Sequence, residues 1–276
     1  MKLYISDLDG TLLNNDKEIS EYTKDTINGL AAKGVYFSVA TARSAASAIK
    51  ILSGVNINIP VVLMNGAAIY DIQKGKYIKT EAIPERTACT VVAILKEHDI
   101  TGFMYAIPED RLVTYYESLN TKALHDFHCE RVIKYAKKFE QTDSFLDKIS
   151  SNNIVYFTLI DEYDRLSKVL NALKRVPHID AVLYRDIYAE NLWYLEIHSK
   201  NASKYNAVKY LREYCRFDRI IGFGDNLNDI PFLEACDEFY AVSNAVEQLK
   251  QKANGVIGSH DSDGVARFII HIETSQ

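Results

Sequence analysis

The sequence begins Met1-Lys-Leu-Tyr-Ile-Ser-Asp7-Leu-Asp9-Gly-Thr11-Leu-Leu, and the remaining predicted elements can be arranged around this segment. The apolar residues before Asp7 have the β-favouring character of a buried strand. Two carboxylates, Asp7 and Asp9, follow at the carboxyl end of that strand. They repel each other, and burying either charge is costly unless a partner compensates it. Because hard oxygen ligands suit Mg²⁺, the stretch predicts a strand that ends at a magnesium site.

The residues that follow alternate between amphipathic and apolar segments. Helices are predicted at 20–33 and 45–52, and strands at 35–40 and 59–64. This order is typical of a parallel sheet with right-handed crossovers. The rhythm returns at about residue 200, where a helix is predicted at 203–215 and an apolar strand at 219–224, followed by further helices and strands to the end.

The middle of the chain has a different pattern. After a short hairpin at 68–80, helices and strands follow in the mixed order of an α+β domain, and a polar, aromatic-rich segment before Asp147 shows no clear periodicity. The predicted fold is therefore α/β, with a doubly wound, Rossmann-like parallel-sheet core and an inserted α+β cap. The core is assigned to residues 1–82 and 189–276, and the cap, expected to set substrate specificity, to residues 83–188.

Composition excludes several classes of protein. A net charge of −5 argues against a nucleic-acid or anionic-membrane partner. The four cysteines have neither disulfide-framework nor zinc-site spacing, and the sequence shows no signal peptide and no apolar run long enough to cross a bilayer. We therefore expect a cytoplasmic enzyme or binding protein, whose oligomeric state is not encoded in any recognisable pattern.

Polar residues follow several of the predicted parallel strands, and ligands bind outside the carboxyl ends of such strands. A lysine begins the helix before the last of them. The set comprises Asp7, Asp9, Thr41, Lys204, Asp225, Asn228 and Asp229. Carboxylates that hold Mg²⁺, with a lysine and a threonine for phosphate oxygens, suit phosphoryl transfer. One aspartate can attack phosphorus while the other moves the proton. The sequence has no GxxxxGK[ST] loop, which excludes a nucleotide-cradling kinase.

These residues resemble the motifs of the haloacid dehalogenase superfamily. Asp7-Leu-Asp9-Gly-Thr11-Leu is similar to its first motif, Thr41 to the second, Lys204 to the third and Gly224-Asp225-Asn-Leu-Asn228-Asp229 to the fourth. The large insertion, Asn65-Gly66 after the third strand, and the tail resemble the Cof-type phosphatase branch. The sequence departs from the pattern at Ala42 and Tyr205, where the family often has glycine, and at Val242-Ser243, where it often has Met-Gly.

The resemblance implies a role for each matched residue. Asp7 would be the nucleophile and a Mg²⁺ ligand, and Asp9 the general acid/base, which also ligates Mg²⁺ through its carbonyl. Asp225 would ligate the metal, with Asp229 behind it. Phosphate would be held by the remaining matched residues, Leu8, Thr41, Ala42, Lys204 and Asn228.

The predicted activity is Mg²⁺-dependent hydrolysis of small phosphomonoesters, such as sugar phosphates, through an aspartyl-phosphate. A sugar phosphomutase is an alternative, because similar motifs serve that chemistry, and a non-catalytic phospho-ligand sensor is a further one. Asp9 argues against the sensor, since a binder needs no acid/base beside the nucleophile. Arg43 and Arg185 are interpreted either as substrate contacts or as surface ion pairs.

Overall fold

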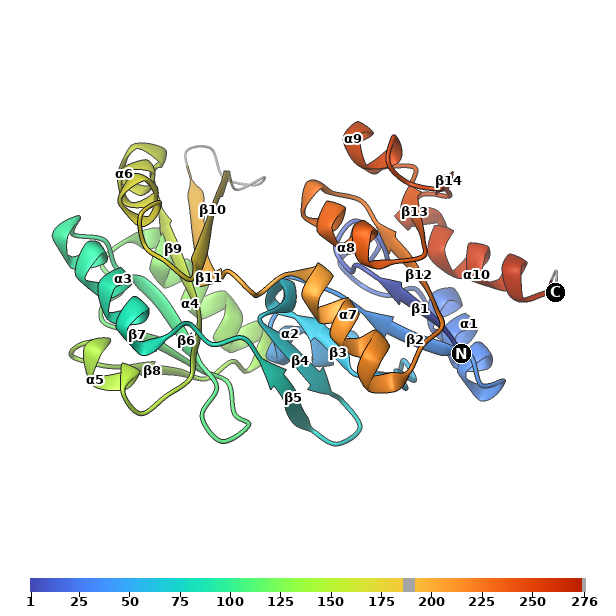
Figure 1. The fold of residues 1–276 in the computed structure, drawn as a ribbon, viewed down its shortest axis with the longest axis horizontal. Helices are drawn as coiled ribbons and strands as arrows, with labels where there is room; N and C mark the ends of the chain where they lie inside the picture. The colour runs from blue at the N-terminus through green and yellow to red at the C-terminus, as the bar shows by residue number, and fades with distance from the viewer. Residues whose placement is uncertain (186–191, 275–276) are drawn as a thin grey trace. The chain divides into compact units, whose positions relative to one another are not determined.

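The computed structural model describes residues 1–185 and 192–274, and Figure 1 shows their arrangement as a ribbon. The chain divides into two compact units, a first unit of Met1–Lys79 and Ser203–Gln276 and a second unit of Thr80–Ala202. The predicted boundary between residues 82 and 83 lies near the first division. The predicted boundary between residues 188 and 189 lies outside the described residues, and the strand Trp193–Ser199, which we had assigned to the core, pairs within the second unit.

The first unit is built on a five-stranded sheet in the order β14-β13-β12-β1-β2. All of its pairings are parallel. Its strands are β1 (Lys2–Ser6), β2 (Tyr36–Val39), β12 (Arg219–Gly224), β13 (Glu238–Val242) and β14 (Gly255–Ile257). The chain winds outward in one direction from β1 and in the other from β12, so the two central neighbours form the switch point at which open α/β sheets bind ligands.

Helices cover both faces of this sheet. They are α1 (Glu21–Ala32), α2 (Ala45–Ile51), α7 (Lys204–Cys215), α8 (Ile230–Ala235), α9 (Glu247–Lys250) and α10 (Gly264–Thr274), with short 3-10 turns η1 (Met64–Gly66), η2 (Leu227–Asp229) and η3 (His260–Ser262). The Phe268 ring of α10 lies 4.3 Å from that of Tyr240, and the Phe232 ring of α8 lies 5.1 Å from that of Phe239. Because successive strand residues point to opposite faces, α8 and α10 pack on opposite sides, which confirms the doubly wound core.

The predicted third strand lies at the margin of this sheet. Strand β3 (Val61–Leu63) is joined to it by a single parallel bridge between Ala40 and Val62. It belongs instead to a three-stranded sheet with β4 (Ala68–Asp71) and β5 (Lys76–Thr80), which form the expected hairpin.

The second unit contains a six-stranded sheet in the order β10-β11-β9-β6-β7-β8. Its strands are β6 (Gly102–Ala106), β7 (Val113–Tyr116), β8 (Phe139–Gln141), β9 (Ile154–Asp161), β10 (Ile179–Arg185) and β11 (Trp193–Ser199), and its helices are α3 (Glu85–Glu97), α4 (Lys122–Tyr135), α5 (Leu146–Ile149) and α6 (Tyr163–Leu173). The pairings are antiparallel except for the parallel β7–β8 pair. This confirms an α+β insert.

Three elements of the second unit were missed by the sequence prediction. Helices α4 and α5 and strand β8 all lie in the polar segment before residue 150. In α4 only Leu124 and Phe127 are buried, so the helix lacks the apolar stripe on which sequence patterns depend. Among the helices of the described residues, none is both long and apolar enough to span a membrane.

Candidate active site

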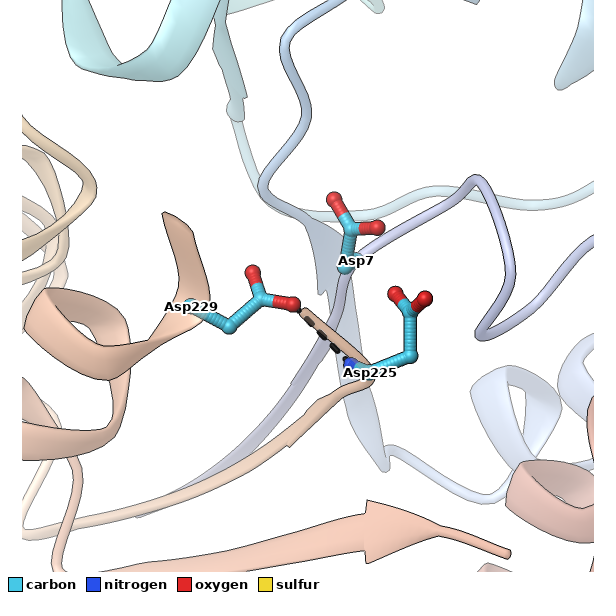
Figure 2. Close-up of side chains that lie close together, drawn as sticks. All are labelled: Asp7, Asp225 and Asp229. Carbon is cyan, nitrogen blue, oxygen red and sulfur yellow. Dashed lines mark hydrogen bonds between the residues drawn. The ribbon is translucent and has the colours of Figure 1, made fainter. Parts of the chain in front are cut away.

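Two aspartates meet at the switch point of the five-stranded sheet. Asp7 follows β1 and Asp225 follows β12, and the Asp7 N–H donates to the Phe223 carbonyl at 2.9 Å, which holds the two strand ends together. One carboxylate oxygen from each of Asp7, Asp225 and Asp229 lies within 4.8 Å of the other two. Figure 2 shows these side chains rising from neighbouring segments around a common point. The topology thus brings together residues that are more than two hundred positions apart.

Lys204 lies within this acidic cluster. Helix α7 begins at Lys204, and the Ser203 hydroxyl caps it by accepting the Asn206 N–H at 3.1 Å. The Lys204 Nζ donates to Asp7 Oδ1 at 2.6 Å and to Asp229 Oδ1 at 2.7 Å. Its side chain is only 1% exposed, so this ammonium is a buried bridge between the two carboxylates.

Asp229 is fully buried and its hydrogen bonds hold the loop after β12. Its Oδ2 accepts the N–H groups of Asp225 at 3.0 Å and Asn226 at 3.1 Å, and Figure 2 marks the first of these bonds. A Cβ at position 224 would lie 2.6 Å from this oxygen, so Gly224 is the residue that lets the carboxylate pack beneath the strand end. Both oxygens of Asp229 are therefore engaged by the protein.

Thr11 orients Asp225. Its hydroxyl donates to Asp225 Oδ1 at 2.9 Å. The preceding Gly10 has a positive φ of 74°, and the Asp225 carboxylate occupies the space that a Cβ at position 10 would need. Sequence reasoning assigned no role to Thr11, although its place directly after the Asp-x-Asp-Gly turn was a usable signal.

The cluster carries more negative than positive charge, and its pKa values reflect this. Burial raises the pKa of Asp7 well above its usual range, against the opposing effect of Lys204. Burial, with Asp229 next, raises the pKa of Asp225 to about 6. Burial alone would lower the pKa of Lys204, but the Asp229 and Asp7 carboxylates outweigh it and raise that pKa.

This donor set fits a divalent cation. Asp7 Oδ1 is engaged by Lys204 and Asp225 Oδ1 by Thr11, whereas Oδ2 of each aspartate accepts no hydrogen bond within the described residues. Two carboxylate oxygens with available lone pairs, in a cluster whose three carboxylates outnumber the single ammonium of Lys204, are what a hard cation such as Mg²⁺ requires.

Asp9 lies apart from the cluster. Its side chain is 51% exposed and forms a bidentate pair with Arg43, with Nε donating to Oδ2 at 2.7 Å and an Nη donating to Oδ1 at 2.6 Å. Arg43 was left open by the sequence as a substrate contact or an ion pair, and in this conformation it makes an ion pair.

The predicted phosphate-binding residues divide into two groups. Thr41 is buried after β2, and its hydroxyl accepts the Arg43 N–H at 3.1 Å. The N–H groups of Leu8 and Ala42 donate to no acceptor within the described residues, so both are available to a ligand. Asn228, by contrast, is exposed on η2, and its side chain makes no hydrogen bond to the part of the chain that the structure describes.

Comparison with known proteins identifies the family. Residues 4–269 match the sequence profile of the haloacid dehalogenase-like hydrolases. The chain is 27% identical to a 5-amino-6-(5-phospho-D-ribitylamino)uracil phosphatase of Bacillus subtilis, with 95% of this chain and 94% of the relative covered. It is 25% identical to a pyridoxal phosphate phosphatase of Escherichia coli, with 95% of each chain covered.

A solved structure supports the same fold. A haloacid dehalogenase-like hydrolase from Bacteroides thetaiotaomicron superposes with a TM-score of 0.82 at 21% identity, covering 98% of this chain and 99% of the other. At that identity the likeness concerns the fold alone. The family match spans both units, and it agrees with the resemblance carried by the strand-end motifs. The chain therefore belongs to the haloacid dehalogenase-like hydrolases.

Proposed function

We propose that this protein is a Mg²⁺-dependent phosphomonoester hydrolase in which Asp7 is the nucleophile. The observation that carries the proposal is the bridge from Lys204 Nζ to Asp7 Oδ1 at 2.6 Å and to Asp229 Oδ1 at 2.7 Å. This bridge fixes the Asp7 carboxylate beside Asp225 and leaves its second oxygen free of protein donors. Both relatives named above are phosphatases of small phosphate esters, which supports the same class of substrate here.

In the proposed reaction, Asp7 Oδ2 attacks phosphorus and the bond from phosphorus to the ester oxygen breaks. Asp9 gives its proton to the departing oxygen, which leaves as an alcohol. Water then attacks the aspartyl-phosphate, the Asp9 carboxylate takes up a proton from that water, and inorganic phosphate leaves as Asp7 is restored.

The remaining site residues would hold the phosphoryl group. Lys204 and the Thr41 hydroxyl are proposed to contact its oxygens, together with the available N–H groups of Leu8 and Ala42, since a ring of donors stabilises the charge that develops during transfer. Asn228 is proposed as a further phosphate contact from the exposed turn after β12.

Asp7, Asp225 and the Asp9 carbonyl are proposed to hold Mg²⁺. Bound there, the ion would neutralise phosphate oxygens and reduce the repulsion between phosphate and the anionic nucleophile. Asp229 would act through the chain, because its hydrogen bonds to the N–H groups of Asp225 and Asn226 fix the loop that carries Asp225.

The proposed role of Asp9 requires its side chain to move. In the described conformation both of its oxygens are held by Arg43. With both oxygens engaged by the guanidinium, neither faces the oxygen of a departing alcohol. We infer that Asp9 exchanges Arg43 for the substrate before the first proton transfer.

The second unit is proposed to select the leaving group, as a cap inserted into a catalytic core. We also propose that the enzyme works in the cytoplasm, which agrees with its four free cysteines. Its substrates would be small phosphate esters, with no role for nucleic acid or membrane.

A phosphate-release screen tests the proposed function. Purified protein is assayed with sugar phosphates, nucleotides and cofactor phosphates, with Mg²⁺ and again with a chelator. We expect Mg²⁺-dependent release of inorganic phosphate and a loss of about 10⁴-fold or more in Asp7→Asn. Asp16→Asn, which changes an exposed loop aspartate, is the matched control. Full activity of Asp7→Asn, or an isomeric phosphate ester as the product in place of phosphate, would contradict the proposal.

A further inference from the structure

The turn that follows Asp9 is held by a segment from the other end of the first unit. Strand β13 ends at Val242, and Asn244 follows it in an exposed loop. The Asn244 Nδ2 donates to the Gly10 carbonyl at 2.8 Å. This loop belongs to the tail whose sequence resembles the Cof-type branch, and none of the proposed catalytic steps uses it.

The peptide between Gly10 and Thr11 is fixed at both of its polar atoms. The Gly10 carbonyl oxygen accepts the hydrogen bond from Asn244, and the Thr11 N–H donates to the Leu8 carbonyl at 3.2 Å. Because a peptide unit is planar, holding both polar atoms fixes the direction of the whole plane. The position of Thr11, which lies at one end of this plane, is therefore set in part by Asn244.

Thr11 extends this constraint to the acidic cluster. Its hydroxyl donates to Asp225 Oδ1 at 2.9 Å. The Asp225 carbonyl in turn accepts the N–H of Val246 at 2.8 Å, two residues after Asn244. The loop after β13 thus contacts both the turn that follows β1 and the end of β12, which are the two segments that carry the proposed Mg²⁺ ligands.

The Asn244 side chain is itself held by the turn η3. Its Oδ1 accepts the His260 N–H at 3.1 Å, and the His260 Nδ1 donates to the Leu13 carbonyl at 2.8 Å. An amide that is engaged at both its oxygen and its nitrogen has little freedom to rotate, so its donor is already directed at Gly10. Such preorganisation reduces the entropy that is lost when a ligand binds.

We propose that Asn244 is a positioning residue for the Mg²⁺ site, which acts through the Gly10–Thr11 peptide to hold the Asp225 carboxylate where the cation binds. The inference rests on the proposed Mg²⁺ site and concerns the binding of the metal rather than the chemical steps. Asn244 would contact neither the metal nor the substrate. Because Mg²⁺ demands near-ideal octahedral geometry, a small rotation of Asp225 is enough to weaken its binding.

Thermal unfolding at increasing Mg²⁺ concentration tests this proposal without requiring turnover. The rise in melting temperature with Mg²⁺ gives an apparent Kd for the metal, because a ligand that binds the folded state stabilises it. Since Asn244→Ala removes one neutral hydrogen bond, we expect this Kd to rise about 3- to 10-fold. An unchanged Kd in Asn244→Ala would overturn the proposal.

Asn28 of α1 provides a matched control. Its Nδ2 donates to the Gly54 carbonyl at 2.8 Å, and its Oδ1 accepts the Asn56 N–H at 2.7 Å. Gly54, like Gly10, has a positive φ. The local contacts are therefore of the same kind as those of Asn244, but they hold the loop between α2 and β3. Asn28→Ala should leave the Kd for Mg²⁺ unchanged, and an equal rise of this Kd in both variants would overturn the proposal.

A double-mutant cycle tests the route through Thr11. Thr11→Val removes the hydroxyl that holds Asp225 and should itself weaken Mg²⁺ binding. If Asn244 acts through Thr11, adding Asn244→Ala to Thr11→Val should raise the Kd by less than about twofold further, because residues that act through a shared contact are not additive. Fully additive losses would contradict the proposed route and overturn the proposal.

These measurements are independent of the phosphate-release screen. If Mg²⁺ binding weakens in Asn244→Ala but the wild-type protein releases no phosphate from any ester, the inference is supported and only the proposed phosphatase activity fails. If the protein is an active phosphatase whose Kd for Mg²⁺ does not depend on Asn244, the proposed function stands and the inference is rejected. A wild-type protein that binds no Mg²⁺ would reject the inference together with the proposed metal site.

Discussion

Lys204 and Lys137 are both buried lysines, yet they have opposite surroundings. Lys204 lies at the carboxyl edge of the five-stranded sheet between two carboxylates, which raise its pKa against the effect of burial. Lys137 follows α4 and is buried over the Tyr105 ring of the six-stranded sheet, where burial and Arg131 lower its pKa well below its usual range. A buried ammonium with partners is part of the protein's own charge balance. Lys137 has no carboxylate partner within the described residues.

Removing Lys204 should produce the largest effect. In Lys204→Met, the carboxylates of Asp7 and Asp229 lose their shared cation, and breaking a buried pair in this way costs about 3–5 kcal/mol. Urea unfolding in the absence of Mg²⁺ measures this loss, and activity should disappear as well. Lys137→Met should change the free energy of unfolding by less than about 1 kcal/mol, because the interactions that it removes are cation–π contacts, to the rings of Tyr105 and Phe139. Equal destabilisation by Lys204→Met and Lys137→Met would contradict the inference that only Lys204 is part of a stabilising buried ion pair.

Asp9→Asn tests the proposed proton transfer to the leaving group at the active site. General acid/base groups contribute about 10²- to 10⁴-fold, so kcat should fall by that factor. The rate of aspartyl-phosphate formation should fall less for p-nitrophenyl phosphate, whose phenolate leaves readily without a proton, whereas the hydrolysis step is common to both substrates. Rapid-quench kinetics with an alkyl and an aryl phosphate measure the formation rate separately. An equal loss in the formation rate for both substrates would argue that Asp9 does not protonate the leaving group.

The position of the Asp225 carboxylate, at the carboxyl edge of the five-stranded sheet, also depends on Gly10. In Gly10→Ala, the new Cβ would meet the Asp225 carboxylate, and the positive φ adds strain of about 1–2 kcal/mol. We expect weaker Mg²⁺ binding, seen as a higher Mg²⁺ concentration for half-maximal activity. Gly29→Ala is the matched control, because a Cβ there has no neighbour within 4 Å. An unchanged Mg²⁺ requirement in Gly10→Ala would show that Asp225 need not hold its position.

Raising the pH should change the contributions of Lys137 and Lys204 to the free energy of unfolding in opposite directions. We expect this effect to be smaller than the preceding ones. The folded state disfavours protonated Lys137, so the unfolded chain binds the extra proton between the lowered pKa and the ordinary value of about 10.4. The contribution of Lys137 to the free energy of unfolding therefore rises with pH through that window. Lys204 has a raised pKa, so its contribution is fully present below that ordinary value and is lost as pH rises through its folded pKa.

Urea unfolding of the wild-type protein and Lys137→Met at pH 7 and pH 9.5 provides the measurement. The difference in stability between them should shift in favour of the wild-type protein as pH rises. A shift in favour of Lys137→Met would mean that Lys137 is compensated in the folded state.

The surroundings of Lys204 could largely be predicted from the sequence. Asp7, Asp225 and Lys204 were assigned to one edge because parallel strands align their carboxyl ends, and the structure brings these three side chains together. The pairing of Arg43 with Asp9 could not be derived, since nothing in the strand pattern fixes the direction of an exposed side chain 34 positions away.

The surroundings of Lys137 in the second unit could not be predicted from the sequence, for physical reasons. Helix α4 buries too few apolar residues to show periodicity, and Lys137 looks like any lysine in a polar segment until the sheet places it over Tyr105. Strand β11 was recognised as a strand but was assigned to the core, because an antiparallel pairing with β9 has no signature in a single sequence.

Chemical trapping of the phosphoenzyme shows directly whether Asp7 is the nucleophile. Enzyme quenched during turnover is reduced with borohydride, which converts an aspartyl-phosphate to homoserine, and the peptide that contains position 7 is analysed by mass spectrometry. If Asp7 is the nucleophile, homoserine appears at position 7 and the aspartate at position 9 is unmodified. Turnover with unmodified Asp7, or label at another residue, would contradict this role of Asp7.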